Sequence, residues 1–130
     1  MMSIQELAQQ ERIPKKFLEQ VLLALKKAGI LQSSRGKTGG YSLGRAPADV
    51  TLGDIIHAVD GPLMALPCLS PVSSTKCVDC VSLENCWLRG VMAEVDDNVA
   101  TVLAKVSLIE MSRRAAQSQR RSAVAAMYHI

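Results

Sequence analysis

All four cysteines of this 130-residue chain fall within one short window. Cys68 comes first, and Cys77, Cys80 and Cys86 follow in the stretch CVDCVSLENC. The spacing is C-x8-C-x2-C-x5-C. Its C-x2-C pair is a common chelating unit, because two intervening residues let both sulfurs face one metal. The pattern therefore predicts a metal site in this window.

The identity of the metal is less constrained by the spacing. A structural zinc site usually has two C-x2-C pairs or a later histidine pair, and this window has a single C-x2-C pair. An iron–sulfur cluster is larger and accepts ligands that are spread unevenly along a loop. Spacing alone leaves iron–sulfur and zinc nearly balanced. Buried structural cysteines and a thioredoxin-like CVDC site are the other interpretations, and the polar, proline-broken loop disfavours both.

Composition indicates a cytoplasmic globular protein. Apolar residues make up 48% of the chain and charged residues 21%, as in ordinary folded domains. The first residues are polar and amphipathic rather than a secretory signal, and no apolar run approaches the roughly 18 residues of a membrane span. We therefore expect no membrane partner, and structural disulfides are uncommon in the cytoplasm. No constellation of His, Ser or carboxylate residues predicts an enzyme.

Positive charge gathers near both ends of the sequence. Residues 12–37 carry seven basic residues against one acidic, whereas residues 38–110 carry four basic against nine acidic. The last stretch has four arginines and no acid: Arg113, Arg114, Arg120 and Arg121. The basic first third indicates a polyanionic partner, and the alternative is a solvated basic helix face.

The first third predicts a helix-turn-helix followed by a hairpin. Ser3 and Glu6 have capping-box spacing at the start of a short helix. Pro14 is suited to open the next helix, KKFLEQVLLALKKAG, whose apolar residues recur at helical spacing. The stretch ILQSSRGKTGGYSLGR then gives two short strands around a basic glycine turn. A hairpin directly after a helix-turn-helix is the plan of a winged helix.

Further helices are predicted on both sides of the cysteine loop. Thr51 and Asp54 form a second capping pair, ahead of a helix that ends at 61–62. After Cys86, apolar residues step alternately by four and three in an unbroken heptad seam, which favours packing against a second copy of the chain over packing within the domain. The seam consists of Leu88, Met92, Val95, Val99, Val102, Val106 and Ile109. The basic tail either continues as a helix or frays.

Several motifs occur in a characteristic order. A Phe-Leu-Glu-Gln helix start, a Lys-x-Gly-Ile helix end and an Arg-Gly-x-x-Gly-Gly-Tyr-x-Leu wing precede VTLGDIIHAVDG and CWLRGVMAEVDDNVATVLAKVSLIEM. Over about residues 3–112 the chain thus resembles the Rrf-two family of bacterial transcription regulators, which has IscR-type members. The resemblance implies a mainly α fold: a winged helix-turn-helix with a small β-hairpin wing and a long C-terminal dimerisation helix. It also implies a homodimeric repressor or activator in which three cysteines hold an iron–sulfur cluster that sets DNA affinity.

The resemblance assigns ligands residue by residue. Cys68, Cys80 and Cys86 match the three cluster cysteines of the family, and Cys77 is an extra thiol. IscR-type members have a histidine ligand three residues after the last cysteine, where this chain has Arg89. The fourth ligand is therefore open.

Cys77 is the first choice for that fourth ligand, ahead of Asp79 and Glu84. A 2Fe-2S cluster is favoured by the resemblance, and four thiolates suit a 4Fe-4S cluster equally. The family also begins with a helix of about 25 residues before the point at which this chain starts. The expectation is accordingly a truncated start or a shortened member.

DNA contacts are expected from the second helix, in the major groove, and from the wing. The candidates are Pro14, Lys15, Lys16, Glu19, Arg35, Gly36 and Lys37. The two lysines would contact phosphates or base edges, Glu19 would accept from a cytosine amino group, and Arg35 is the best candidate for the minor groove. The alternative for each charge is a plain role in solubility. A dimer would read a pseudo-palindromic double-stranded operator with half-sites about one or two helical turns apart.

The sequence thus divides into four parts. These are a winged helix-turn-helix DNA-binding domain over residues 1–62, a cysteine-rich cluster-binding loop over 63–86, a dimerisation helix over 87–112 and a basic tail over 113–130. The predicted function is sequence-specific transcription regulation in which the cluster orders the loop and fixes the angle between two DNA-reading heads. The alternative is a winged-helix regulator with a structural zinc or a thiol-redox switch in the same loop.

Overall fold

The mainly helical architecture that the sequence predicts is confirmed. The computed structural model describes residues 1–71 and 75–128, so parts of the predicted loop and tail lie outside the described residues. The described elements are five α-helices, one antiparallel pair of strands and a short 3-10 helix. They are α1 (Ile4–Glu11), α2 (Lys15–Lys27), β1 (Leu31–Ser34), β2 (Gly40–Leu43), α3 (Leu52–Asp60), η1 (Pro67–Leu69), α4 (Trp87–Ala104) and α5 (Leu108–Tyr128).

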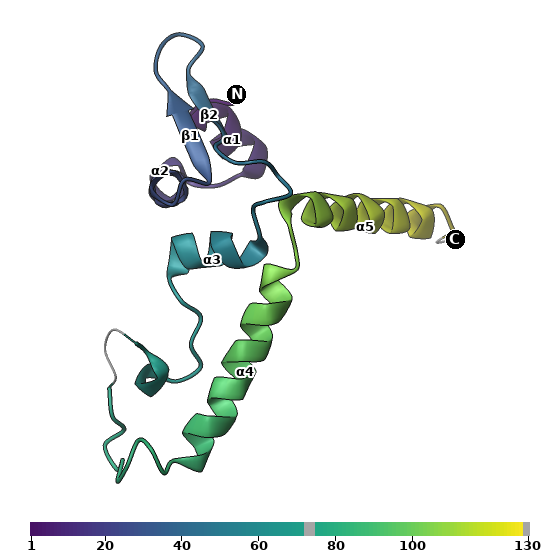
Figure 1. The fold of residues 1–130 in the computed structure, drawn as a ribbon. Coiled ribbons are helices and arrows are strands. Elements are labelled where there is room, and N and C mark those ends of the chain that lie inside the picture. The colour runs from purple at the N-terminus through teal and green to yellow at the C-terminus, as the bar shows by residue number, and fades with distance from the viewer. Residues whose placement is uncertain (72–74, 129–130) are drawn as a thin grey trace.

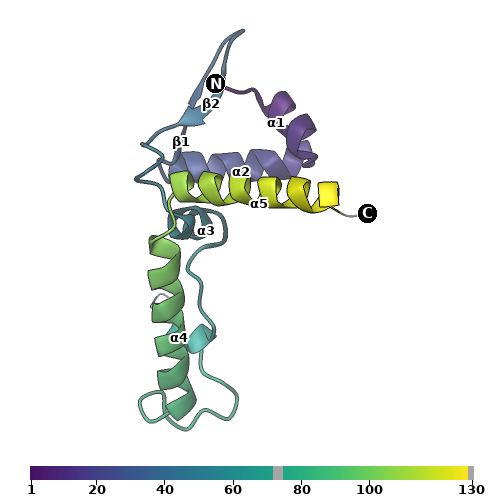
Figure 2. The same ribbon diagram turned by 90° about the vertical axis from the view of Figure 1, so that its right-hand side faces the viewer.

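The elements form three parts, which we call the head, the stalk and the arm. The head comprises α1, α2, the hairpin and α3. Figure 1 shows the stalk, α4, running away from the head, with the η1 segment alongside it. The arm, α5, leaves sideways from the point where the head and the stalk meet (Figures 1 and 2).

Local signals set the ends of the helix-turn-helix. In the capping box of α1, the Ser3 N–H donates to Glu6 Oε2 (2.8 Å) and the Glu6 N–H donates to Ser3 Oγ (3.3 Å). The helix ends at Arg12, which adopts a left-handed conformation with φ of 55°. Pro14 follows, and its carbonyl accepts the first hydrogen bond of α2 from the Leu18 N–H (3.0 Å). The turn between the two helices is therefore short, as predicted.

A small aliphatic core holds α2 in the head. Leu18 and Leu22, one helical turn apart, are 7% and 5% exposed, and Ile30 just after the helix is 2% exposed. Gly29 lets the chain leave α2 because its φ of 71° suits a residue without a Cβ. Burial of this aliphatic face fixes α2 and leaves its opposite face open.

The hairpin has the register expected of a wing. β1 and β2 are antiparallel, with Leu31 opposite Leu43. The N-terminal segment pairs with β2, because Met2 and Tyr41 exchange backbone hydrogen bonds of 3.1 and 2.8 Å. Gly40 permits this close approach, since a Cβ at that position would collide with the Met2 carbonyl. The hairpin is thereby anchored at its base, and its turn projects away from the stalk (Figure 2).

The second predicted capping box is present at α3. The Thr51 N–H donates to Asp54 Oδ2 (3.0 Å) and the Asp54 N–H donates to Thr51 Oγ1 (3.1 Å). The hydrogen bond from the Thr51 N–H is the main cause that holds the pKa of Asp54 below its usual value. The helix ends at Gly61, with φ of 80°.

The heptad seam, predicted as unbroken, is interrupted. α4 ends at Ala104 and α5 begins at Leu108, so no single helix spans residues 87–112. The three residues between the helices, 105–107, lie against the head instead. Val106, a predicted seam residue, is 9% exposed within the head, and Ile109 lies on the arm.

The interruption follows from a pairing between two similar tripeptides, VTL at 50–52 and VSL at 106–108. The Leu52 N–H donates to the Val106 carbonyl (2.8 Å), and the Leu108 N–H donates to the Val50 carbonyl (2.9 Å). Val50 is fully buried beside this pairing. The backbone hydrogen bonds of this pairing therefore take the place of the helical hydrogen bonds that one continuous helix would have formed. Burial in the head further stabilises the interrupted arrangement.

Most of the remaining seam lies open on the stalk, whereas Met92 is half-buried. Leu88, Val95, Val99 and Val102 are 42%, 43%, 40% and 62% exposed, and Val91 beside them is 49% exposed. A contiguous row of exposed aliphatic side chains usually marks an interaction surface. The stalk thus keeps the apolar stripe that the sequence predicts, over a shorter length.

Candidate nucleic-acid interface and cysteine loop

The start of α2 gathers the polar residues predicted to contact DNA. Pro14, Lys15, Lys16 and Glu19 are all exposed there, on the part of the helix that the core leaves open. Two lysine charges and one carboxylate within about one turn can interact with phosphates and base edges. Phe17, between them, is 58% exposed, and sequence reasoning did not single it out.

The wing presents the other predicted contacts. Arg35, Gly36 and Lys37 are exposed in the turn between β1 and β2. The Gly39 N–H donates to the Gly36 carbonyl (3.0 Å), and Gly36 has φ of 121°, which favours glycine. Figure 1 shows α2 and the wing on the flank of the head that faces away from the arm.

The far end of α2 has a structural role that the sequence did not reveal. Lys26 Nζ donates to Ser33 Oγ on β1 (2.6 Å), so this lysine ties the helix to the wing. It thereby helps to hold the wing relative to the start of α2.

The cysteines divide into a group of three and one that stands apart. Cys77, Cys80 and Cys86 line one hollow of about 400 Å³ together with Asp79, and the Cys80 N–H donates to the Cys77 carbonyl (3.1 Å). Cys77 is exposed, whereas Cys80 and Cys86 are half-buried. All four thiols are free, and Cys68 is buried on η1, away from the lining of that hollow.

The described residues do not bring a complete set of metal ligands together. No group of three or more His, Cys, Asp or Glu side chains in the described part of the chain is arranged to hold a metal ion. Asp79 lines the hollow of the three cysteines, and Glu84 does not. The donors that share the hollow are soft thiols, which is the chemistry that zinc and iron–sulfur clusters prefer. The predicted ligand set remains a prediction.

Two contacts tie the η1 segment to the stalk. Arg89 Nε donates to the Cys68 carbonyl (3.4 Å), and the Ala65 N–H donates to both carboxylate oxygens of Asp96 (3.0 and 3.2 Å). Arg89 therefore anchors the backbone of the buried cysteine to the first turn of α4. Neither contact was predicted, since both join residues more than 20 positions apart.

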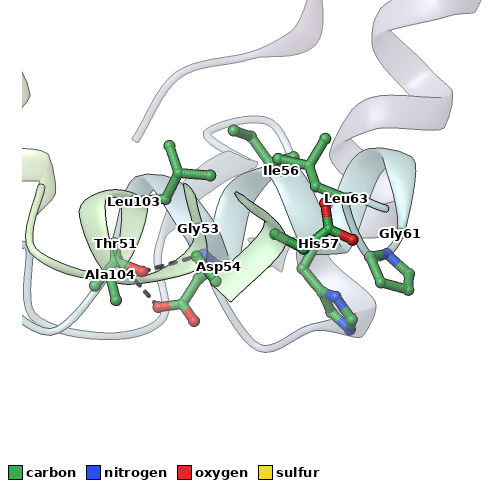
Figure 3. A pocket seen from close by; sticks show the side chains of 12 residues that line it. Thr51, Gly53, Asp54, Ile56, His57, Gly61, Leu63, Leu103 and Ala104 are labelled. Atoms are coloured by element: carbon green, nitrogen blue, oxygen red, sulfur yellow. Dashed lines mark hydrogen bonds between the residues drawn. The ribbon is translucent and has the colours of Figure 1, made fainter. Parts of the chain in front are cut away.

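A second hollow lies where α3 meets the stalk. Its volume is about 300 Å³, and its lining includes Ile56 and His57 from α3, Leu63 after it and Leu103 from α4. Figure 3 shows these side chains around it, with the capping bonds between Thr51 and Asp54 at one end. The two helices are in close contact near the C-terminal end of α4, where Gly53 meets Leu103.

The fold and the exposed basic elements define a winged helix-turn-helix protein. The Rrf2 family model, described as "Iron-dependent Transcriptional regulator", matches residues 1–114. The chain belongs to this family of transcriptional regulators, as the sequence motifs predicted.

Curated and solved relatives agree with this assignment. An Rrf2-like HTH-type transcriptional regulator of Rhodobacter capsulatus is 41% identical over 110 residues, which cover 85% of this chain and 73% of the relative. The solved structure of CymR, titled the global cysteine regulator of B. subtilis, has a TM-score of 0.64 at 28% identity and covers 87% of this chain and 78% of CymR. The solved structure of T. potens IscR has a TM-score of 0.65 at 29% identity and covers 91% of this chain and 73% of T. potens IscR.

Within the described residues, none of the helices combines the length and the apolar character that crossing a bilayer requires.

Proposed function

We propose that this chain is a homodimeric, sequence-specific transcription regulator whose DNA affinity is controlled by an iron–sulfur cluster in the cysteine loop. Regulation of transcription follows from family membership. One observation carries the choice of ligand: Cys77, Cys80 and Cys86 line a common hollow at the foot of the stalk. Three soft donors around one space suit a metal centre better than they suit a packed core.

The proposed ligands are Cys68, Cys80 and Cys86, with Cys77 in the fourth position. Cys68 sits on η1, which one hydrogen bond from Arg89 holds against α4, so its thiol would join the other three through a movement of the loop. A bound cluster would supply an anionic, redox-active centre. We favour 2Fe-2S, and 4Fe-4S is compatible with the same four thiolates.

The loop is placed so that its conformation can affect DNA binding. It connects the end of α3 to the start of α4, and α3 packs against α2. Ordering the loop would set the angle between head and stalk across the hollow shown in Figure 3. In a dimer that angle fixes the distance between two copies of α2, and hence the spacing of half-sites.

The remaining surfaces support the DNA-binding and dimer parts of the proposal. Lys15, Lys16 and Glu19 would enter the major groove, and Arg35 in the wing would reach phosphates or the minor groove. The exposed valine stripe of the stalk would pack against a second copy of the chain. Two heads would then read a pseudo-palindromic operator.

Two measurements test the proposal. Anaerobic purification should give brown protein with iron and acid-labile sulfide in nearly equal amounts, about two of each per chain for 2Fe-2S. Gel shifts on operator DNA should show different affinities for cluster-loaded and apo protein. Equal affinities on every operator, or protein without iron or sulfide, would refute the sensing role.

A thiol switch is a second candidate, and the exposure of Cys77 favours it. This thiol lies three residues before Cys80, whose N–H donates to the Cys77 carbonyl, and the two cysteines share a hollow. A relative of similar fold is titled a cysteine regulator. A colourless protein whose DNA affinity falls after diamide and returns with dithiothreitol would favour this candidate over the cluster. Colourless protein that contains zinc would indicate a structural site instead.

A further inference from the structure

The hollow between α3 and the stalk is a cavity to which the proposed function assigns no ligand. Its volume of about 300 Å³ is at the lower end of the range for small-molecule sites. Among the described residues, no cysteine lines it. A molecule bound there would touch both the head and the stalk, because α3 forms one wall and α4 another.

The walls of this hollow are mostly aliphatic. Ile56 comes from α3, Leu63 from the segment after it and Leu103 from α4, as Figure 3 shows. Gly53 and Gly61 also line the hollow and add no side chain that would fill it. Leu63 is 51% exposed, so an apolar body held against it would remove aliphatic surface from water. The hollow therefore suits a ligand with a small hydrocarbon body.

The charge on the lining is negative. Asp54 and Asp96 both line the hollow, and among the described residues no lysine or arginine does so. Asp54 already has a cation beside it, since Arg45 Nη2 lies 3.6 Å from Asp54 Oδ2. Asp96 is half-buried and forms no ion pair in the part of the chain that the structure describes. The carboxylate of Asp96 is therefore the uncompensated charge of the hollow.

Asp96 has the capacity for a second partner. Its two oxygens share one donor, the Ala65 N–H, at 3.0 and 3.2 Å. An ionised carboxylate can accept about four hydrogen bonds, so acceptor sites remain for a charged donor. An ammonium group matches this need, because a hydrogen bond between ionised partners is about twice as strong as a neutral one. The imidazole of His57, also on the lining, offers a further nitrogen acceptor when it is neutral.

The wall on α4 is separate from the valine stripe. Asp96, Ala100 and Leu103 recur at intervals of four and three residues, so they form a row of their own along α4. That row faces its own chain, since Asp96 accepts from Ala65 and Leu103 meets Gly53. A second copy that packs on the stripe would therefore lie on a different side of α4.

We propose that this hollow is an effector site for a small organic cation, with the ammonium group on Asp96 and the hydrocarbon body against Ile56, Leu63 and Leu103. The bound cation would hold α3 against α4 and so bias the angle between head and stalk. Its effect on DNA affinity rests on the proposed function, whereas the binding itself does not.

Calorimetric titration of the full chain with three six-carbon probes tests the site. n-Hexylamine should bind at one molecule per chain with a dissociation constant of about 1 mM or lower, as expected for a ligand of this size. 1-Hexanol and hexanoate have the same hydrocarbon body without the positive charge, and they should bind at least about tenfold more weakly. Hexanoate that binds as tightly as hexylamine, or hexylamine that shows no saturable binding, would overturn the site.

Two matched variants test the role of the carboxylate. Asp96→Asn keeps an oxygen that accepts from the Ala65 N–H and removes the charge, so it should weaken hexylamine binding about fivefold or more. The control is Asp97→Asn, which makes the same change of charge at a neighbouring residue outside the lining of this hollow. It should leave hexylamine binding within about twofold of wild type. Equal losses in the two variants would overturn the site, because general attraction to negative charge would then account for binding.

Gel shifts on operator DNA test the effector role. Saturating hexylamine should change the operator affinity of the wild type about threefold or more, relative to ammonium chloride at the same concentration. Asp96→Asn should show less than half of that change. An equal change in both proteins, or none in a wild type that binds hexylamine, would overturn the effector role. Protein without iron or sulfide would refute the proposed cluster and leave this site standing.

Discussion

The head holds its shape with two capping boxes, a strand register and buried leucines, whereas the described residues of the cysteine loop contain one buried side chain, that of Cys68. The loop is held by backbone turns and by two side-chain contacts with the stalk, those of Arg89 and Asp96. The two regions lie next to each other in the chain, and they differ in what stabilises them.

This difference bears on function, because a region with little packing of its own can be reshaped by a ligand at low cost in free energy. The head must keep one conformation to read DNA, and its core and caps provide it. The loop needs two states if it is to sense anything. The following predictions test whether the two regions are in fact separable.

The largest effect is expected from Cys80→Ala. Loss of a central ligand should lower bound iron by at least about tenfold and abolish the difference in operator affinity between loaded and apo protein. The melting temperature of the apo protein should stay within about 2 °C of wild type. Ser82→Ala, in the same hollow, is the control and should retain iron. Unfolding of the apo protein by Cys80→Ala would show that loop and head are not separable.

Leu22→Ala should destabilise the head, in contrast to the substitution in the loop. Removing a leucine that is 5% exposed should destabilise the head by about 2–5 kcal/mol, as measured by urea denaturation. Val81→Ala in the loop removes a fully exposed side chain and should change stability by less than about 0.5 kcal/mol. Similar losses for the two variants would contradict the contrast drawn between the regions.

Thr51→Ala should cost about 1 kcal/mol of stability, because it removes the side-chain cap of α3. Thr51→Ser keeps the hydroxyl and should lose less than half as much. Thermal melts of both variants measure the difference. An unchanged melt for Thr51→Ala would mean that the pairing of VTL with VSL is sufficient to hold this junction.

Arg89→Gln tests the contact that joins the loop to the stalk. Loss of its hydrogen bond to the Cys68 carbonyl should release η1 and speed the loss of iron to a chelator about two- to fivefold. The stability of the apo head should not change. Arg89→Lys should lose iron at a rate between those of wild type and Arg89→Gln. If Arg89→Gln lost iron at the wild-type rate, the hydrogen bond from Arg89 would not be the contact that holds the loop in place.

The smallest effect concerns pH and the root of the arm. Hydrogen bonds from Arg113 and Arg114 lower the pKa of Glu110 from 4.5 to about 2. Because this carboxyl has a lowered pKa in the folded state, its contribution is complete above about pH 5 and disappears as the pH falls toward 2. The nuclear magnetic resonance titration of Glu110 should therefore be displaced to low pH. Replacing Arg113 and Arg114 by Gln should return it to the ordinary range.

The head was largely predictable because its signals are local. Ser3 with Glu6 and Thr51 with Asp54 are three residues apart, and both capping boxes formed as predicted. Ser107 and Glu110 have the same spacing, and the Glu110 N–H donates to Ser107 Oγ (3.3 Å). This third pair was the available sign that a new helix begins at 108 and that the heptad seam is interrupted there.

The cysteine site was predictable in composition but not in geometry. Four thiols in one window are visible in the sequence, and the family resemblance chose Cys68, Cys80 and Cys86 among them. The structure places Cys77, Cys80 and Cys86 around one hollow and Cys68 on η1, and the ligand set itself stays a prediction. Spacing along a chain does not fix distances in a loop, because each intervening residue has two free backbone torsions.

The amino-acid sequence by itself determined the first three helices, the hairpin, the family and the positions of the basic residues, since caps, turns and periodicity act over a few residues. Tertiary structure decided that Val106 is buried in the core of the head, that Lys26 ties α2 to the wing and that residues 112–128 of the arm are exposed. The physical reason is that these outcomes depend on competition between contacts distant in sequence. Burial of Val106 beside Val50 outweighs one more turn of helix only once the head has formed.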